Sequence, residues 1–269
     1  MTAKPLELTF WGVRGSIPTP VAENLGVGGN TACLTIRYPG QPLLIFDAGS
    51  GIRNLGNALP GGVAFELFLT HFHWDHIQGI PFFLPLQRQD SNATIHSMVD
   101  PTDLERILAR QMLPPYYPVS MPAGLDYRRI VENGTRFGDV LVRPFPLHHP
   151  NGATGYRIES PRAVIVYASD HEHGNAQIDA VVLENSRDAD ILIYDAQYTS
   201  TEYERRRGWG HSTWQEGVQL ALKAGVRQLI LFHHDPLRTD LQLDAIVQEA
   251  QTKFPNTIAA REGWSASLP

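Results

Sequence analysis

The six residues from His71 to His76 constrain the fold of this chain more than any other stretch. They read His-x-His-x-Asp-His and follow the apolar, strand-like run 63–69. Imidazole nitrogens and a carboxylate are ligands that suit zinc and similar borderline cations. Four such groups within six residues are too dense for an ordinary surface cluster. The pattern therefore predicts a metal site at the end of a strand.

Apolar runs bounded by glycine, proline or polar residues predict strands along the whole chain. They cover residues 6–11, 32–37, 43–46, 63–69, 93–98, 128–131, 140–146, 155–159, 163–167, 190–194 and 227–232. Helices are expected over residues 52–59, 81–89, 101–110, 178–184 and 241–253, and between Thr213 and Gly225. No flexible linker, composition shift or internal repeat interrupts this order, so a single domain over residues 1–269 is expected.

Histidine or aspartate stands at the end of several predicted strands. These residues are His71, His149, Asp170, Asp195 and His233. Structural histidines scatter among helices, loops and strand faces, whereas these gather where the loops of an α/β sheet converge on a ligand. The pattern predicts one shared site that is assembled from distant segments.

Two of these strand ends carry adjacent histidines, which leaves the ligand undecided. Successive side chains of a strand point to opposite faces, so only one of His148 and His149 can face the site. The same ambiguity holds for His233 and His234. Three further histidines do not stand at a strand end. His171 and His173 fit either a substrate contact or a solvated loop, and His96 is expected to be structural.

His211 directly precedes a predicted helix. Thr213 and Glu216 have the spacing of a capping box, and Gly225 supplies a stop signal. Free amides and the helix dipole favour an anion at such a position, where an imidazole could donate a proton to a leaving oxygen. The alternative is a surface histidine at a helix entry. The upstream arginines 205–207 fit a phosphate clamp or, more readily, a solvated basic turn.

The composition is that of an ordinary globular protein, and it narrows the choice of partners. Of 269 residues, 42% are hydrophobic and 19% charged, with a net charge of −6. An acidic balance argues against a surface that coats long nucleic acid or an anionic membrane. Cys33 is the only cysteine, which excludes an intrachain disulfide and a thiolate-rich metal site. With no signal-peptide pattern and no apolar run of transmembrane length, a cytoplasmic location is expected.

Taken together, the motifs resemble the metallo-β-lactamase superfamily. The His-x-His-x-Asp-His motif, His149, Asp170 and His233 follow its five-motif order over nearly the whole chain. Four further segments are similar to the phosphodiesterase branch that contains ribonuclease Z and the cyclic-nucleotide phosphodiesterase-like proteins. They are Gly29-Asn30-Thr31, Phe46-Asp47-Ala48-Gly49, Gly155-Tyr156-Arg157 and His211-Ser212-Thr213. Residues 12–18 resemble the start of bacterial phosphodiesterase-like members.

The resemblance implies a fold and a ligand set. The fold is the αββα sandwich, in which two mixed sheets are flanked by helices. The family pattern selects His149, six residues before Gly155, and His233, which Pro236 follows. It implies two divalent cations, expected to be Zn²⁺, although Mn²⁺ or Fe fits the same ligands. One would be held by His71, His73 and His149, and the other by Asp75, His76 and His233, with Asp170 bridging.

The function expected from this set is that of a dinuclear metal phosphodiesterase acting on a small phosphodiester, in the first place a cyclic or other nucleotide. The cations would convert a bridging water into hydroxide near neutral pH. Asp75 or Asp170 would orient this nucleophile, and His211 would act as the general acid. The candidate substrate contacts are Asn30, Thr31, His173 and Arg207.

Two other functions are weighed against this one. The alternative is an RNA 3′-processing nuclease of the ribonuclease Z type, and the third hypothesis is a metal-loaded nucleotide-binding protein without catalysis. Ribonuclease Z usually carries a long arm that grips tRNA, and no insertion here looks like one. Together with the acidic charge, this makes long nucleic acid an unexpected partner. A homodimer is compatible with the sequence.

One long connecting segment has two interpretations. Residues 111–126 are rich in proline and aromatic side chains. We interpret them as an ordered loop or lid over the site; the alternative is a packed connector.

Overall fold

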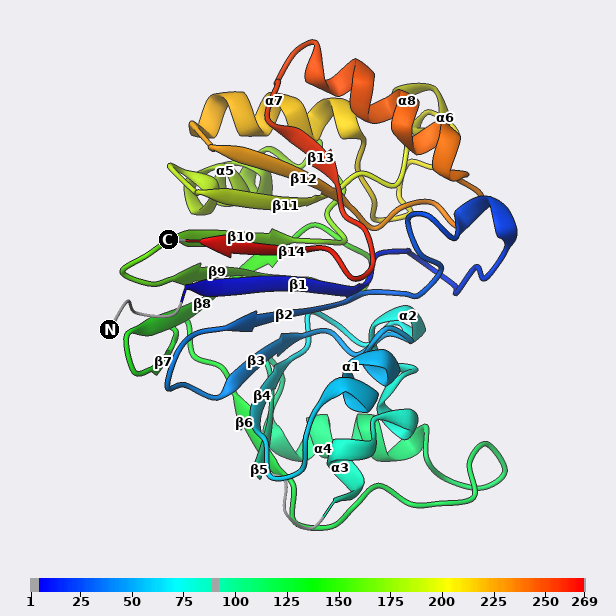
Figure 1. Cartoon of the computed structure of the whole chain (residues 1–269), viewed down its shortest axis with the longest axis vertical. Helices are drawn as coiled ribbons and strands as arrows, with labels where there is room; N and C mark the ends of the chain where they lie inside the picture. The colour runs from blue at the N-terminus through cyan, green and yellow to red at the C-terminus, as the bar shows by residue number, and fades with distance from the viewer. Residues whose placement is uncertain (1–4, 89–91, 269) are drawn as a thin grey trace.

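The computed structural model describes residues 5–88 and 92–268 and arranges them as two stacked β-sheets with helices on the outside (Figure 1). Within these residues, each sheet has seven strands. Both sheets combine parallel with antiparallel neighbours. The αββα sandwich expected from the sequence is confirmed.

The first sheet has the strand order β14-β1-β2-β3-β4-β5-β6. Its strands are β14 (Ser265–Leu268), β1 (Leu6–Gly12), β2 (Cys33–Arg37), β3 (Leu43–Phe46), β4 (Ala64–Phe68), β5 (Asn92–Ser97) and β6 (Asp126–Arg129). Because β3 to β6 are parallel, their C-terminal ends meet at one edge. Asp47 follows β3 at this edge, and the histidine motif follows β4.

The second sheet has the order β13-β12-β11-β10-β9-β8-β7. Its strands are β13 (Thr257–Ala259), β12 (Gln228–Phe232), β11 (Ile191–Asp195), β10 (Val164–Ala168), β9 (Ala153–Glu159), β8 (Val140–Leu147) and β7 (Thr135–Phe137). The strands β10 to β13 are parallel. Their C-terminal ends carry Asp170, Asp195 and His233, so the second sheet also presents its polar side chains at one edge.

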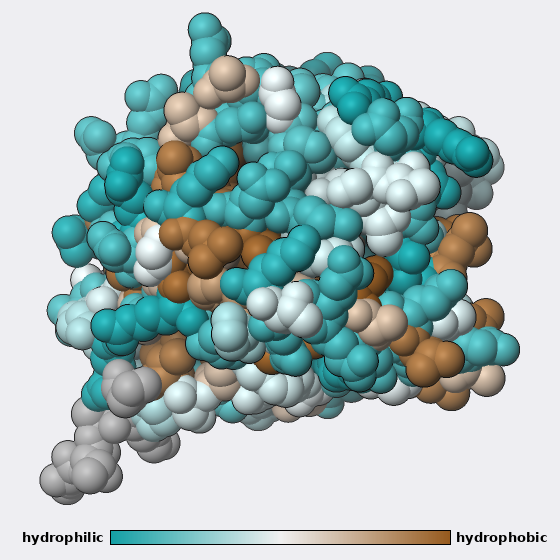
Figure 2. All heavy atoms as spheres, turned by 90° about the horizontal axis from the view of Figure 1, so that it is seen from above, coloured by the Kyte–Doolittle hydropathy of each residue, from teal (hydrophilic) through white to brown (hydrophobic). Residues whose placement is uncertain are grey.

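Helices cover the outer faces of both sheets. The first sheet is accompanied by α1 (Ile52–Ala58), α2 (Trp74–Ile77), α3 (Leu84–Gln87) and α4 (Pro101–Arg110), and by the 3-10 turn η2 (Ile80–Phe82). A second 3-10 turn, η1 (Ala22–Asn24), contacts the helix over residues 240–251. The second is accompanied by α5 (Ala176–Ser186), α6 (Ser200–Tyr203), α7 (Trp214–Ala224) and α8 (Asp240–Gln251). Figure 2 looks down on α7 and α8 and shows a mostly hydrophilic outer face. None of the helices in the described residues combines the length and the apolar character of a membrane span.

Three apolar cores hold the four layers together. The central core lies between the sheets and includes Phe46 and Tyr156, whose ring centroids are 5.4 Å apart. One outer core packs Leu55 of α1 and Leu104 of α4 onto the first sheet. The other packs Trp214 of α7 with residues of α5 onto the second sheet. The buried sheets give a rigid frame for loops at their shared edge.

The helix predicted over residues 81–89 does not form as one continuous helix. The chain instead forms η2 and α3, with Phe83 outside the helical region between them. Pro85 lacks the amide that a continuous helix needs for its hydrogen bond, which accounts for the break. Gln89 lies outside the described residues. The strand predicted over 128–131 is observed as β6, two residues earlier.

Residues 111–126 are anchored to the rest of the domain by a few side chains, whereas Leu113, Tyr116 and Val119 are exposed. The hydroxyl of Tyr117 donates to the carbonyl of Pro81 at 3.0 Å, and its ring meets that of Phe82 edge-on. Met112 is buried in the outer core beneath α4. These contacts support the connector interpretation rather than a lid.

Candidate dinuclear metal centre

Three histidines from two sheets form the first ligand cluster. His71 and His73 follow β4, and His149 follows β8. One ring nitrogen of each lies within 4.8 Å of the others. His149 Nε2 is 3.0 Å from His73 Nδ1. The geometry allows the three imidazoles to share one cation.

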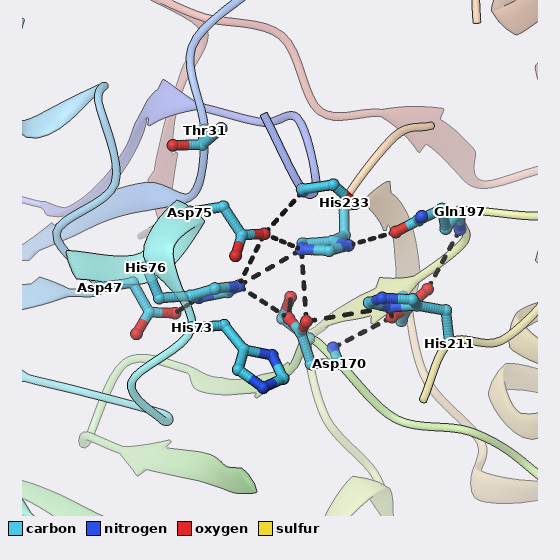
Figure 3. A network of polar contacts seen from close by, with 12 residues as sticks. Thr31, Asp47, His73, Asp75, His76, Asp170, Gln197, His211 and His233 are labelled. Atoms are coloured by element: carbon cyan, nitrogen blue, oxygen red, sulfur yellow. Dashed lines mark hydrogen bonds and ion pairs between the residues drawn. The ribbon is translucent and has the colours of Figure 1, made fainter. Parts of the chain in front are cut away.

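A second cluster contains Asp75, His76, Asp170 and His233, whose ligand atoms also lie within 4.8 Å of one another (Figure 3). Asp170 Oδ2 is 3.2 Å from His76 Nε2, and Asp170 Oδ1 is 3.3 Å from His233 Nε2. Asp170 also lies 3.9 Å from His71 Nε2 of the first cluster. It is therefore placed between the two clusters.

Backbone conformation turns three acidic or imidazole side chains toward this centre. Asp47, Asp170 and His233 all have positive φ, at 59°, 60° and 58°. Each stands directly after or close to the C-terminal end of a strand, β3, β10 or β12. A left-handed conformation costs a non-glycine residue on the order of 1 kcal/mol. The fold retains this left-handed conformation at three strand ends that converge on one site.

Neighbouring groups fix the orientation of the imidazoles. His76 Nδ1 is 2.8 Å from Asp47 Oδ2, and His233 Nδ1 is 2.8 Å from Gln197 Oε1. His149 Nδ1 donates to the carbonyl of Gly210 at 2.8 Å. In each case Nδ1 is engaged by an acceptor and Nε2 is directed at the cluster, which is the usual arrangement of a metal-binding histidine.

The first cluster also contains a buried polar atom without a partner. His71 Nδ1 lies 3.0 Å from Thr70 Oγ1, whereas the buried Nε2 has no hydrogen-bond partner among the described residues. Burying an unpaired nitrogen is unfavourable. This orphaned nitrogen and the His/Asp donor set both fit bound divalent cations.

The electrostatics of the two clusters differ. Burial lowers the pKa of His71, His73 and His149, so these imidazoles are held in the neutral form that binds metals. Burial would also lower the pKa of His233, but Asp170 and Asp75 outweigh it and raise the pKa to about 9. The carboxylates thus concentrate negative charge where a second cation would bind.

His211 lies at the border of the two clusters. Its Nδ1 donates to Asp195 Oδ2 at 2.8 Å, and its ring centroid is 4.8 Å from that of His233. Thr213 caps α7 by accepting from the amide of Glu216, which is one of the two hydrogen bonds of the predicted capping box. Asp195, noted in the sequence only as a strand end, is therefore the partner of His211.

In each pair of adjacent histidines, one side chain joins a cluster and the other points elsewhere. His149 and His233 join the clusters, whereas His148 Nδ1 bonds the carbonyl of Glu172 and His234 Nε2 bonds that of Ala260. Two further histidines also lie outside the clusters. His171 Nε2 is 3.2 Å from Asp179 Oδ1, and His96 Nε2 is 2.6 Å from Glu66 Oε2.

Three of the four predicted substrate contacts are engaged elsewhere. Asn30 donates to Glu262 and accepts from Ser50, and Thr31 Oγ1 accepts from the amide of Ser50 and from Gln78. Their polar atoms hold loops together, so a substrate contact is not supported. Arg207 pairs with Glu204 at 2.8 Å on the surface, which fits the solvated basic turn.

His173 remains close to the site. Its Nδ1 lies 2.9 Å from Ser212 Oγ, one residue after His211. It is half-buried, and its ring centroid is 4.3 Å from that of Tyr203. The structure places it beside the loop that carries His211 rather than in either metal cluster.

Sequence reasoning missed the residues that support the ligands. Asp47 could have been found, because it stands at the end of a predicted strand like the other site residues. Gln197 and Glu172 carry no such signal: Glu172 accepts from the amides of Gly208 and Gly210 at 2.6 and 2.7 Å. It holds the loop before His211.

Comparison with known proteins identifies the family. Residues 44–234 match the model of the beta-lactamase superfamily domain, and the chain belongs to this superfamily. Among curated proteins, the chain is similar to several metal-dependent hydrolases.

Several curated relatives bear the name ribonuclease Z. The chain is 27% identical over 316 positions to that of Gemmatimonas aurantiaca, covering 98% of this chain and 96% of the relative. It is 28% identical over 315 positions to that of Methanosarcina acetivorans, covering 98% of both. These alignments extend over nearly the full length of each protein.

Solved structures show the same fold. The metallo-beta-lactamase fold protein YhfI from Bacillus subtilis superimposes with a TM-score of 0.77 at 19% identity, covering 98% of this chain and 99% of YhfI. The short form of human tRNase Z gives 0.68 at 20% identity, with coverage of 98% and 99%.

Proposed function

We propose that this chain is a dinuclear metal-dependent phosphodiesterase. The observation that carries the proposal is Asp170, which lies between two histidine-rich clusters while His211 stands at their border. His71, His73 and His149 would hold one divalent cation, and Asp75, His76 and His233 the other, with Asp170 between them. Zn²⁺ suits this set of imidazoles and carboxylates, and Mn²⁺ or Fe would also fit.

The cations, when bound, would supply Lewis-acid chemistry that offsets phosphate charge and activates water. The protein's own residues supply orientation and proton transfer. Asp75 and Asp170 would orient the attacking water through their carboxylates. His211, held by Asp195, would give its proton to the leaving oxygen. An alkoxide of high pKa leaves slowly without such a proton.

Two substrate classes, RNA 3′ ends and compact phosphodiesters, are each favoured by a different observation. The names of the curated relatives favour the RNA 3′-processing activity, which the sequence analysis placed second. However, the alignment with the Gemmatimonas relative has 316 positions, more than the 269 residues of this chain, so that relative contains segments absent here. The shorter chain and its net charge of −6 support a compact phosphodiester such as a cyclic nucleotide.

A substrate panel separates these classes. We expect purified protein loaded with Zn²⁺ or Mn²⁺ to hydrolyse bis(4-nitrophenyl) phosphate. The panel adds cyclic nucleotides, dinucleotides and an RNA with a 3′ extension. Preference for the RNA with a steep salt dependence would assign RNA processing. Tight nucleotide binding without turnover of any member would instead indicate a nucleotide-binding protein.

The general-acid role of His211 has its own test. In His211→Ala, kcat for an alkyl ester should fall about 100-fold, which is the usual contribution of a positioned proton donor. The loss should be much smaller for a nitrophenyl ester, because nitrophenolate leaves without protonation. Metal content should match the wild type. Equal losses on both esters would argue against proton donation by His211.

A further inference from the structure

A cleft of about 800 Å³ opens beside the first histidine cluster. It lies where the three cores meet. Phe72 and Val99 pack on the outer core of the first sheet, Met98 on the central core, and Val181 on the outer core of the second sheet. Because His73 also lines the cleft, an occupant would lie next to the first cluster.

The lining of this cleft is mainly apolar and carries little charge. Phe72, Met98 and Val181 provide apolar surface, and Asn151 and Asn185 provide neutral amides. Among the described residues that line it, Glu132 has an ionisable carboxylate and none is lysine or arginine. A chain of phosphates would need cationic partners. The lining therefore suits an uncharged group.

We propose that the cleft binds a flat, uncharged ring of the substrate, a nucleobase in a nucleotide or RNA substrate. This inference rests on the proposed phosphodiesterase function. A volume of about 800 Å³ lies within the usual range for small-molecule sites. The Nδ2 of Asn185 donates to the carbonyl of Val181 at 2.9 Å, which leaves its Oδ1 to accept from a base edge.

The position of His211 indicates which part of the substrate the cleft takes. His211 would protonate the leaving oxygen, and it is not among the residues that line the cleft. Its ring lies 5.3 Å from that of His149, whereas the cleft adjoins His73. The ring in the cleft is therefore on the group that stays attached to phosphorus.

Substrates with one leaving group and different retained groups test this inference. We compare methyl, phenyl and 5′-thymidyl esters of 4-nitrophenyl phosphate. The wild type should hydrolyse the phenyl and thymidyl esters with kcat/KM at least about 10-fold above that of the methyl ester, which corresponds to about 1.4 kcal/mol. The leaving group is constant, so the difference reports the retained group.

Filling the cleft should remove this preference. In Val181→Trp, kcat/KM should fall about 10-fold for the phenyl and thymidyl esters and stay within about twofold for the methyl ester. Gln177→Trp places the same side chain on an exposed position of α5 and should match the wild type. Equal kcat/KM across the three esters, or an equal loss on all three in Val181→Trp, would overturn the inference.

Failure of the phosphodiesterase proposal would look different. In that case, no ester would be hydrolysed with Zn²⁺ or Mn²⁺ although the protein is folded by circular dichroism. The cleft would then be tested by binding of thymidine 5′-monophosphate to the Zn²⁺-loaded protein. A Kd about 10-fold weaker in Val181→Trp than in Gln177→Trp would support the cleft, and an unchanged Kd would reject it.

Discussion

His211 takes its orientation from a single buried carboxylate. Asp195 Oδ2 accepts from His211 Nδ1, while Asp195 Oδ1 accepts from the amides of Gln197 and Ser212 at 3.1 and 3.3 Å. Because the backbone fixes this carboxylate, the imidazole has one preferred orientation. This contact engages Nδ1 and leaves Nε2 as the nitrogen that would act on the substrate.

Replacing Asp195 by asparagine keeps the side-chain shape and removes the charge. In Asp195→Asn, kcat for an alkyl phosphodiester should fall about 10- to 100-fold. The loss should be much smaller for a 4-nitrophenyl ester, because nitrophenolate leaves without protonation. Metal content and KM should change little. An equal loss on the alkyl and the nitrophenyl ester would assign Asp195 a purely structural role.

At the residue scale, the sequence was informative where a side chain stands at a strand end. His71, Asp170 and His233 could be predicted as site residues in this way. Gln197 could not, because its contact with His233 joins residues 36 positions apart and depends on the loop after β11. Similarly, the internal hydrogen bonds of Asn30 depend on Glu262, at the other end of the chain.

The loop before α7 is the element that joins His211, the proposed proton donor, to the first histidine cluster. Gly208 and Gly210 both have positive φ, at 84° and 88°. Their amides donate to Glu172, and the carbonyl of Gly210 accepts from His149. The conformation of this loop therefore influences both His211 and the orientation of His149.

The two glycines provide a matched pair of variants. A Cβ at Gly210 would lie 2.1 Å from His149 Nδ1, whereas a Cβ at Gly208 would meet nothing within 4 Å. Both alanines incur the cost of positive φ, about 1 kcal/mol. Only Gly210→Ala should also displace His149, and it should lose at least about 10-fold in Zn²⁺ affinity relative to Gly208→Ala. Equal affinities by competition with a chelating dye would refute this coupling.

At the element scale, most strands and helices were predicted to within a few residues, whereas strands of three residues were not. The strand at 190–194 corresponds closely to β11, and the helix after Thr213 to α7. The strands β7 and β13 each have three residues, too few for a period of two to emerge from the sequence. They exist because neighbouring strands offer hydrogen bonds at the sheet edge.

At the scale of the whole molecule, the segment after β1 connects the two sheets beside the candidate metal centre. The amide of Gly15 donates to the carbonyl of His234, and the amide of His234 donates to that of Val13, both at 3.0 Å. Buried Arg14 donates through Nε to the carbonyl of Gly28 and through Nη1 to that of Arg238. The ligands on both sheets therefore share one packed junction.

His234 makes the stability of this junction depend on pH. It is fully buried, its Nε2 donates to the carbonyl of Ala260, and burial together with nearby Arg14 lowers its pKa to about 3. An unfolded histidine has a pKa of about 6.5. The folded state thus disfavours the protonated form. Its stabilising contribution is complete above about pH 6.5 and declines as the pH falls toward 3.

His234→Gln should reduce this dependence, because glutamine can donate to Ala260 but does not titrate. Between pH 6.5 and pH 4.5, the wild type should lose up to about 1.4 kcal/mol of unfolding free energy per pH unit more than the variant. Both proteins are unfolded with urea in the presence of a chelator, so that neither carries a metal ion. The other histidines then titrate alike in wild type and variant, and their effect cancels in the difference between the two curves. A cation at the adjacent His233 would act in the same direction, since positive charge also disfavours protonation of His234. Parallel curves for wild type and variant would show that His234 does not control the acid sensitivity of the junction.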